Sequence, residues 1–258
     1  MAQALSNWHH MSARFYHGIG RALIGAMRQT INILKTVFNR AMGLPGALLD
    51  AMGLRPAKRI RVFIKILRDE QGIPVAQPAD LEVGLATAQR ILAEQVNVFL
   101  QPPVPGVTAT EMVSVLDEPA PREALDVHCD AQAWREDFGI AGEFFSRHLA
   151  RNFFGTLLGA GAPVTVFIVR DVKDKAGCSL GPLTDYVTVA PSGLAGGFLN
   201  GDETGPLHAR TIAHEIAHAC ALWHVGDRSN LMHPSTDGTQ LSLWQKVVLR
   251  NSRHVTYW

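Results

Sequence analysis

The chain has 258 residues, of which 47% are hydrophobic and 18% are charged, and its formal net charge at pH 7 is +1. A chain of this length and composition can bury one substantial core, and its near-zero net charge excludes a global electrostatic attraction to nucleic acid. No apolar run reaches the roughly 18 residues that a transmembrane helix needs, and no secretory signal peptide is apparent.

Residues 1–57 are predicted to form a basic helical extension. From Met1 to Arg68 the sequence contains eleven Lys and Arg residues and a single acidic residue, Asp50. Residues 12–42 have the periodicity of an amphipathic helix. Its apolar face holds Tyr16, Ile19, Leu23, Met27, Ile31, Leu34, Val37 and Phe38, and its polar face holds Arg14, Arg21, Arg28, Gln29, Asn32, Lys35 and Asn39.

This helix is expected to end before Gly43-Leu44-Pro45-Gly46, with a short second helix over residues 47–54 and a domain boundary near Ala57. Three roles are open for residues 12–42: contact with an anionic membrane surface, a pro-segment over a functional cleft, or packing on the rest of the chain or on a partner subunit.

Residues 58–258 are predicted to form one α+β unit. Period-two alternation indicates a strand over residues 60–67, and helical spacing indicates a backing helix over residues 81–100. Further elements follow in chain order: strands over residues 163–172 and 186–190, a glycine-rich loop over residues 193–205, and a final helix over residues 241–250.

Residues 211–218 read Thr-Ile-Ala-His-Glu-Ile-Ala-His and contain the pattern HExxH. On a helix, positions i and i+4 lie on the same face, so His214 and His218 can bind one metal ion with Glu215 beside them. A zinc ion held in this way lowers the pKa of a bound water toward about 7, and a glutamate can take the proton of that water as it attacks a carbonyl. The pattern therefore predicts hydrolysis of peptide bonds.

A catalytic zinc site has three protein ligands and an open fourth position, so a third ligand is required. A thermolysin-like glutamate is excluded, because no Glu follows Glu215 and the acidic residues beyond it are Asp227 and Asp237. His224 is the best candidate for the third ligand.

The segment from His214 to His224, with Asn230-Leu231-Met232-His233-Pro234 after it, resembles the metzincin metallopeptidases. Metzincins carry HExxHxxGxxH and a methionine-containing turn beneath the metal. The resemblance implies one catalytic zinc ion bound by His214, His218 and His224, with Glu215 as the catalytic base and Met232 as the Met-turn residue.

The resemblance also implies the fold: a metzincin-like catalytic domain over residues 58–258, with a small mixed twisted sheet, a backing helix and an active-site helix. In that family the strand before the glycine-rich loop is an edge strand to which the substrate adds. By the resemblance, Tyr186 to Ala190 should form one wall of the cleft.

The sequence departs from the family pattern at Ala221 and directly after Met232. Ala221 stands where the family has the glycine that ends the active-site helix, so Ala221 must permit the turn at positive φ, or the helix must end a residue or two later. Asp227 stays open as an alternative third ligand, because a related subgroup uses aspartate there. His233 and Pro234 follow Met232, where the family often has a tyrosine that helps to hold the oxyanion.

Cys220 is expected to be buried and inert on the active-site helix. Cys129 and Cys178 are favoured as a disulfide, because metzincins are mostly extracytoplasmic and oxidising compartments permit disulfides. Two free thiols, or Cys129 as an inhibitory thiolate on the zinc, are the alternatives. The resemblance and this pairing favour an extracytoplasmic or secreted location.

The sequence thus favours a zinc-dependent endopeptidase that acts on protein or peptide substrates through a zinc-bound water activated by Glu215. The alternative is a non-hydrolytic, zinc-containing module that binds a membrane or a partner through its basic N-terminal helix. Glu215 argues against this alternative, because a structural zinc site needs no general base.

Overall fold

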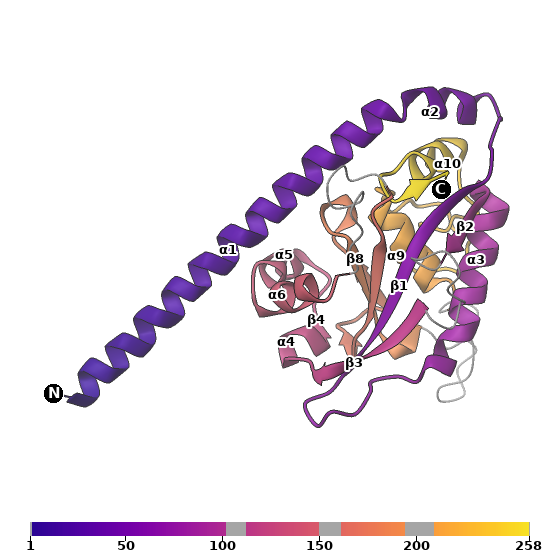
Figure 1. Cartoon of the computed structure of the whole chain (residues 1–258). Helices are drawn as coiled ribbons and strands as arrows, with labels where there is room; N and C mark the ends of the chain where they lie inside the picture. The colour runs from indigo at the N-terminus through magenta and orange to yellow at the C-terminus, as the bar shows by residue number, and fades with distance from the viewer. Residues whose placement is uncertain (1, 102–111, 150–160, 194–208, 258) are drawn as a thin grey trace.

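A mixed sheet of seven strands forms the centre of the computed structural model, which describes residues 2–101, 112–149, 161–193 and 209–257 (Figure 1). The longest strand, β1 (Lys58–Arg68), pairs in parallel with β2 (Val98–Gln101), β3 (Val113–Pro119) and β5 (Val164–Ile168), and antiparallel with β9 (Val255–Thr256). Beyond β5 lie β8 (Tyr186–Val189), which is parallel to it, and β7 (Gly177–Ser179), which is antiparallel to β8.

The alternating pattern of β1 explains its central place. Ile60, Val62, Ile64 and Ile66 are all fully buried, whereas most of the residues between them are partly exposed. Because successive side chains of a strand point to opposite faces, these four β-branched residues all face one layer of the core. The strand predicted over residues 60–67 is confirmed.

Helices cover both faces of the sheet (Figure 1). On one face, α3 (Glu82–Val96) and α9 (Thr211–Ala219) share a buried cluster with the isoleucines of β1. A second cluster joins α4 (Arg122–Leu125) and α6 (Ile140–Arg147) to Phe167 and Tyr186 on the strands, and α5 (Ala131–Asp137) lies beside α6. The predicted α+β fold class is confirmed.

Short elements complete the fold of residues 58–258. They are η1 (Pro78–Leu81), η3 (Gly181–Leu183), η4 (Pro191–Gly193), the small parallel pair β4 (Asp126–Val127) and β6 (Asp171–Val172), and α10 (Leu243–Arg250). The helix α10 confirms the final helix predicted over residues 241–250. Most of the predicted glycine-rich loop, residues 194–205, lies outside the described residues.

Three predicted boundaries were wrong. The backing helix ends at Val96 rather than Leu100, because Asn97 adopts the left-handed conformation (φ 50°) and the chain enters β2. The strand predicted over residues 163–172 is two strands, β5 and β6, which belong to different sheets. The second helix, α2 (Leu44–Ala51), begins earlier than residue 47. Amide groups in the first turn of a helix have no acceptor within the helix, so Pro45, which has no N–H, is tolerated there.

The predicted edge strand was also wrong. The strand at residues 186–189, β8, is paired on both sides, with β5 and with β7. The strand that ends the order of the described sheet is β7, which comes earlier in the sequence and folds back antiparallel onto β8. With only three residues it is too short to give a period-two signal.

The N-terminal region begins with one long helix, α1 (Ala2–Met42), which continues almost directly into α2 (Figure 1). The first part of α1 extends beyond the body of the molecule, and its second part runs along it. Among the described residues, no helix combines the length and apolar content that crossing a membrane requires.

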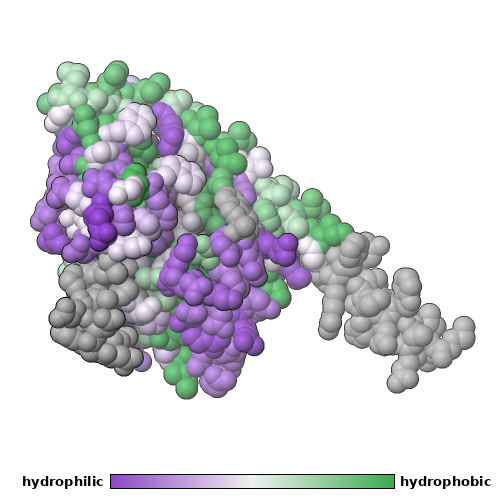
Figure 2. Space-filling view, turned by 180° about the vertical axis from the view of Figure 1, so that it is seen from behind, coloured by the Kyte–Doolittle hydropathy of each residue, from purple (hydrophilic) through white to green (hydrophobic). Residues whose placement is uncertain are grey.

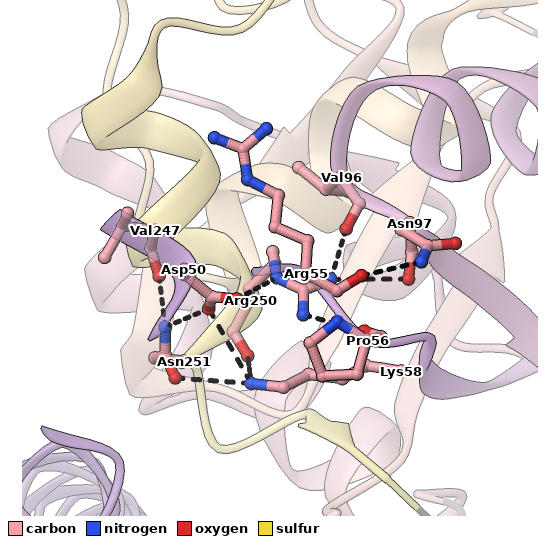
Figure 3. A network of polar contacts seen from close by, with 9 residues as sticks. All are labelled: Asp50, Arg55, Pro56, Lys58, Val96, Asn97, Val247, Arg250 and Asn251. Atoms are coloured by element: carbon pink, nitrogen blue, oxygen red, sulfur yellow. Dashed lines mark hydrogen bonds and ion pairs between the residues drawn. The ribbon is translucent and has the colours of Figure 1, made fainter. Parts of the chain in front are cut away.

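A buried polar network fixes α2 to residues 58–258 (Figure 3). The fully buried Arg250 guanidinium donates from Nε to Asp50 Oδ1 (2.7 Å) and from Nη2 to the Pro56 carbonyl (2.8 Å). Asn251 Nδ2 donates to the other Asp50 oxygen (2.8 Å), and Lys58 Nζ donates to the Arg250 carbonyl (2.9 Å). Asp50, the acidic residue of the basic extension, is therefore a structural partner of the last helix.

Candidate active site

The helix α9 carries the HExxH residues and is held by its apolar positions. Ile212, Ala213, Ile216 and Ala217 are fully buried in the core cluster beneath the sheet. The i and i+4 spacing then places His214 and His218 together on one side of the helix. The sequence of α9 thus determines both the face that packs and the face that can bind.

Ala221 ends this helix in the way the sequence requires. Its φ is +70°, the left-handed conformation that glycine adopts without strain. The Ala221 amide donates to the His218 carbonyl (2.8 Å), and the Leu222 amide donates to the Ala217 carbonyl (3.0 Å), which together form a Schellman motif. The chain reverses here and brings His224 back toward the helix, so the predicted strained turn at Ala221 is confirmed.

The three histidines meet at their Nε2 atoms. The Nε2–Nε2 distances are 3.1 Å between His218 and His214, 3.1 Å between His218 and His224, and 3.2 Å between His214 and His224. Nitrogens bound at about 2.0–2.1 Å to one tetrahedral zinc ion lie roughly 3.3 Å from each other. Within the described residues, these three side chains form the one cluster suited to holding a metal ion.

The partners of the other ring nitrogens fix the proton positions. His214 Nδ1 lies 2.7 Å from the Leu231 carbonyl and His218 Nδ1 lies 2.8 Å from the Leu222 carbonyl. A carbonyl can only accept, so both Nδ1 atoms carry the proton and both Nε2 atoms present a lone pair. Lone pairs that converge at this distance repel one another unless a cation lies between them. The donor set therefore fits a zinc ion.

Burial keeps these ligands unprotonated. Desolvation, together with the smaller influence of a neighbouring histidine, lowers the pKa of His214 to about 3 and that of His218 to about 4. Desolvation also lowers the pKa of His224, which is the most exposed of the three. At neutral pH the histidines are thus in the form that binds a metal.

Asp227 is occupied elsewhere. One of its carboxylate oxygens accepts hydrogen bonds from the Ser229 amide (2.9 Å) and the Ser229 hydroxyl (2.8 Å), so it closes a local turn. The structure brings His224, and not this alternative ligand, to His214 and His218.

A turn that contains Met232 lies beneath His214. The His233 amide donates to the Asn230 carbonyl (3.0 Å), and the Asn230 side chain accepts from the Met232 amide (2.9 Å). Met232 is fully buried, and the carbonyl of the residue before it, Leu231, is the acceptor for His214 Nδ1. The turn thus orients a ligand through its backbone.

Arg210 secures this turn and was missed by the sequence reasoning. Its guanidinium donates from Nη1 to the Leu231 carbonyl and from Nη2 to the His233 carbonyl (2.7 Å). It lies four residues before His214, on the same side of the helix, and this spacing is the sequence signal that could have identified it.

The Glu215 side chain is buried next to the three histidines. Its Oε2 atom is buried and has no hydrogen-bond partner among the described residues. Desolvation raises the pKa of its carboxyl to about 8, against the opposing influence of Lys175 and Arg210. A buried carboxylate without a partner is costly, so its retention beside three converging ligands indicates a chemical use.

Gly177 of β7 makes room for this carboxylate and was also missed. A Cβ built on Gly177 would lie 2.8 Å from both Glu215 Cγ and Glu215 Oε1, which is closer than real Cβ atoms come. The approach of the β7 backbone thus requires glycine, and no local sequence pattern signals such a long-range contact.

The site opens into a cleft of about 740 Å³. Its walls include β7 and the residues before it, the helix α9, exposed Trp223, and Pro234 and Ser235 after the turn. Cys129 and Cys178 also line the cleft and form the predicted disulfide, with a Cα–Cα distance of 5.5 Å, while Cys220 is free and buried as expected. The disulfide excludes Cys129 as a thiolate ligand in this state.

No protein-family model matches the sequence, and no curated protein matches it at a significant level. Among solved structures, the chain is similar to a zinc-dependent peptidase from Methanocorpusculum labreanum, with 13% sequence identity and a TM-score of 0.43 over 73% of this chain and 99% of that chain. It is also similar to metalloproteinase-II from Bacteroides fragilis, with 11% identity and a TM-score of 0.43 over 74% of this chain and 52% of that chain. The chain thus spans about half of the second protein. At this sequence identity and TM-score, neither similarity is evidence of function.

Proposed function

We propose that this protein is a zinc-dependent endopeptidase of metzincin type. The observation that carries the proposal is the meeting of three histidine Nε2 atoms beside an unpartnered, buried glutamate oxygen at the wall of an open cleft. A structural zinc site has four protein ligands and no base. Three ligands and a base are the composition of a hydrolytic site.

In this proposal His214, His218 and His224 hold one zinc ion through Nε2. The bound ion would supply Lewis acidity, which lowers the pKa of a water molecule and polarises the substrate carbonyl. The Leu231 and Leu222 carbonyls hold the rings of His214 and His218 in the orientation that binds.

Glu215 is the general base. Its free oxygen takes a proton from the attacking water and then delivers it to the nitrogen of the departing amine, so the carboxylate is regenerated in each cycle. Burial raises its pKa to about 8 in the metal-free site, which makes the carboxylate a stronger base than an exposed glutamate. A nearby cation would shift this pKa downward and favour the ionised form that catalysis needs.

The substrate would lie along β7. This strand has one partner in the described sheet, β8, so its outer backbone groups can pair with an extended peptide. Since β7 also contacts Glu215 through Gly177, a peptide added there would pass directly over the base. An open cleft and backbone pairing suit an internal peptide bond, which is the reason for proposing an endopeptidase.

Met232 is proposed as the Met-turn residue, a hydrophobic support beneath the metal ligands. The disulfide between Cys129 and Cys178 is consistent with an extracytoplasmic location.

Metal content tests the ligand assignment. Wild-type protein should hold one zinc per chain by elemental analysis, and His214→Ala, His218→Ala and His224→Ala should each abolish stoichiometric binding. Asp227→Ala is the matched control, because it removes a nearby polar side chain that is not part of the cluster. Zinc retained by His224→Ala and lost by Asp227→Ala would contradict the assignment.

A further inference from the structure

The helix α1 is packed with its polar side inward. Along residues 18–41 the positions that are buried or partly buried are all glycine or polar: Gly18, Gly20, Arg21, Gly25, Arg28, Gln29, Asn32, Lys35, Thr36 and Asn39. The exposed positions are all apolar except Thr30 and Arg40. A surface helix ordinarily buries its apolar side, so the orientation is the reverse of the usual one.

Specific contacts hold α1 in this orientation. Arg28 Nη2 donates to Asp137 Oδ1 (2.6 Å), and Gln29 Nε2 donates to Asp137 Oδ2 (2.7 Å). Asn32 Nδ2 donates to the Leu183 carbonyl (2.8 Å). Gly25 lies against Phe138 so closely that a Cβ there would be 2.5 Å from the ring. A rotation of α1 about its axis would break all of these contacts, so the outward side is fixed.

Asp137 links this attachment to the sheet. Its side chain is fully buried, and it also accepts from the Tyr186 hydroxyl (2.5 Å) on β8. The pairing with Arg28 compensates a carboxylate that would otherwise be buried with neutral donors alone. The polar side of α1 is therefore an integral part of the catalytic unit.

The outward side forms a continuous apolar strip, defined by the exposed large hydrophobic residues of 19–54. They are Ile19, Leu23, Ile24, Met27, Ile31, Ile33, Leu34, Val37 and Phe38 on α1, and Leu44, Leu48, Leu49, Met52 and Leu54 on and after α2. Figure 2 shows the strip as a green band along α1 and over α2, on a ridge rather than in a groove. Apolar patches of this extent on soluble proteins mark interaction sites.

The extension that carries the strip has an excess of positive charge. Among residues 18–57, Arg40 is exposed, Arg21, Arg28, Lys35 and Arg55 are partly exposed, and the acidic residue, Asp50, is fully buried against Arg250. Outside this range, Glu143 lies 3.9 Å from Arg21. A second copy of the chain placed on the strip would add the cations of its own extension to these. An anionic surface would instead neutralise them.

We propose that the apolar strip lies in the plane of an anionic membrane surface and attaches the protein there as a peripheral, in-plane helix. A straight, convex apolar ridge with flanking cations fits a flat interface of acyl chains and anionic headgroups. The polar side of the helix, which faces water in an isolated amphipathic peptide, is occupied here by the catalytic unit. The attachment is therefore rigid, and the catalytic unit is held at a fixed orientation above the lipid.

Vesicle flotation of the full-length protein tests the proposal. The protein should bind vesicles of phosphatidylcholine with about one third phosphatidylglycerol, and this binding should weaken as salt is raised. The triple variant Leu23→Gln, Met27→Gln, Leu34→Gln changes residues at the centre of the strip and should weaken binding about 100-fold or more. Arg40→Glu should weaken binding to the anionic vesicles to a smaller extent.

A second triple variant tests whether any loss of exposed apolar side chains, wherever they lie on the surface, weakens binding to vesicles. Ile73→Gln, Val83→Gln, Trp244→Gln changes equally exposed residues outside the strip and should bind as wild type. Circular dichroism and urea unfolding of both triple variants should match wild type, because the changed side chains are exposed.

Three outcomes would overturn the proposal. The first is an absence of vesicle binding by the wild type. The second is equal binding to vesicles of pure phosphatidylcholine. The third is a dimer in light scattering that the strip variant alone dissociates, with no vesicle binding by the dimer, since a second copy would then cover the strip.

Discussion

Ala221 holds a backbone conformation that costs an alanine roughly 1–2 kcal/mol relative to the right-handed region. Its φ of +70° is imposed by the return of the chain toward His224 and by the two hydrogen bonds that end α9. The strain at Ala221 therefore accompanies the turn that brings His224 toward His214 and His218.

Ala221→Gly should raise the free energy of unfolding by about 0.5–1 kcal/mol, because glycine adopts positive φ without strain and this gain exceeds its larger entropy in the unfolded chain. Urea unfolding of the zinc-free protein measures the change. Ala219→Gly, in the regular last turn of α9, is the control and should lower stability by about 1 kcal/mol. A destabilisation of equal size at both positions would show that Ala221 is not strained.

Zinc affinity should depend little on histidine protonation between roughly pH 7.5 and 5.5. The lowered pKa values of His214 (about 3) and His218 (about 4) mean that these ligands stay neutral as the pH falls through the usual histidine range. Three ordinary histidines with pKa of about 6.5 would lose up to about 1,000-fold in affinity per pH unit below that value. Competition with a chelator across this range measures the dependence, and a loss as steep as that of ordinary histidines would refute the burial argument.

At the residue scale, the site could be predicted where the chemistry is local. The spacing of His214, Glu215 and His218 and the required turn at Ala221 follow from helix geometry, and the structure brings His224 to them. Arg210 could have been identified from its position four residues before His214, whereas Gly177 acts through a contact distant in sequence, of which a single sequence contains no sign.

At the scale of elements, β7 approaches Glu215 closely through Gly177, and in the proposed function it would also align the substrate. The sequence did not predict it, because a strand of three residues has no measurable periodicity, and the family resemblance assigned the edge to β8 instead. Long periodic elements such as β1, α3 and α10 were predicted to within a few residues at each end.

Gly177→Ala should lower the hydrolysis rate by about tenfold or more while zinc stays bound. The added methyl group would displace Glu215, with which it would overlap, and misplaced catalytic groups lose rate steeply. Gly226→Ala is the control, because a Cβ there meets nothing within 4 Å. Equal activity of the two variants would show that the β7 backbone does not constrain the base.

At the scale of the whole molecule, the N-terminal extension and the catalytic unit are joined by buried polar contacts. The boundary near Ala57 was placed where glycine and proline cluster, and it remains a prediction. The contacts of Asp50 with Arg250 indicate that α2 belongs with the catalytic unit, which the sequence could not indicate because 200 residues separate the two side chains.

Asp50→Ala should lower the free energy of unfolding by about 3–5 kcal/mol, because it leaves the fully buried Arg250 without its carboxylate. Asp117→Ala, which removes an exposed carboxylate on β3, should change it by no more than about 0.5 kcal/mol. For the same reason, a truncation that removes residues 1–42 should melt at a higher temperature than one that removes residues 1–57. The reverse order, together with a small effect of Asp50→Ala, would support the boundary near Ala57.

The central claim is that three histidines and Glu215 form a hydrolytic zinc site. Its most direct test is cleavage of a broad peptide library by zinc-loaded wild type and by Glu215→Gln, with zinc content measured on the same samples. The substitution keeps the size of the side chain and removes its basicity. Zinc should therefore remain at one per chain, while hydrolysis falls by more than the roughly 10²–10⁴-fold that general-base help provides. Zinc-loaded wild type that cleaves nothing in the library, or Glu215→Gln that cleaves as fast as wild type, would contradict the account.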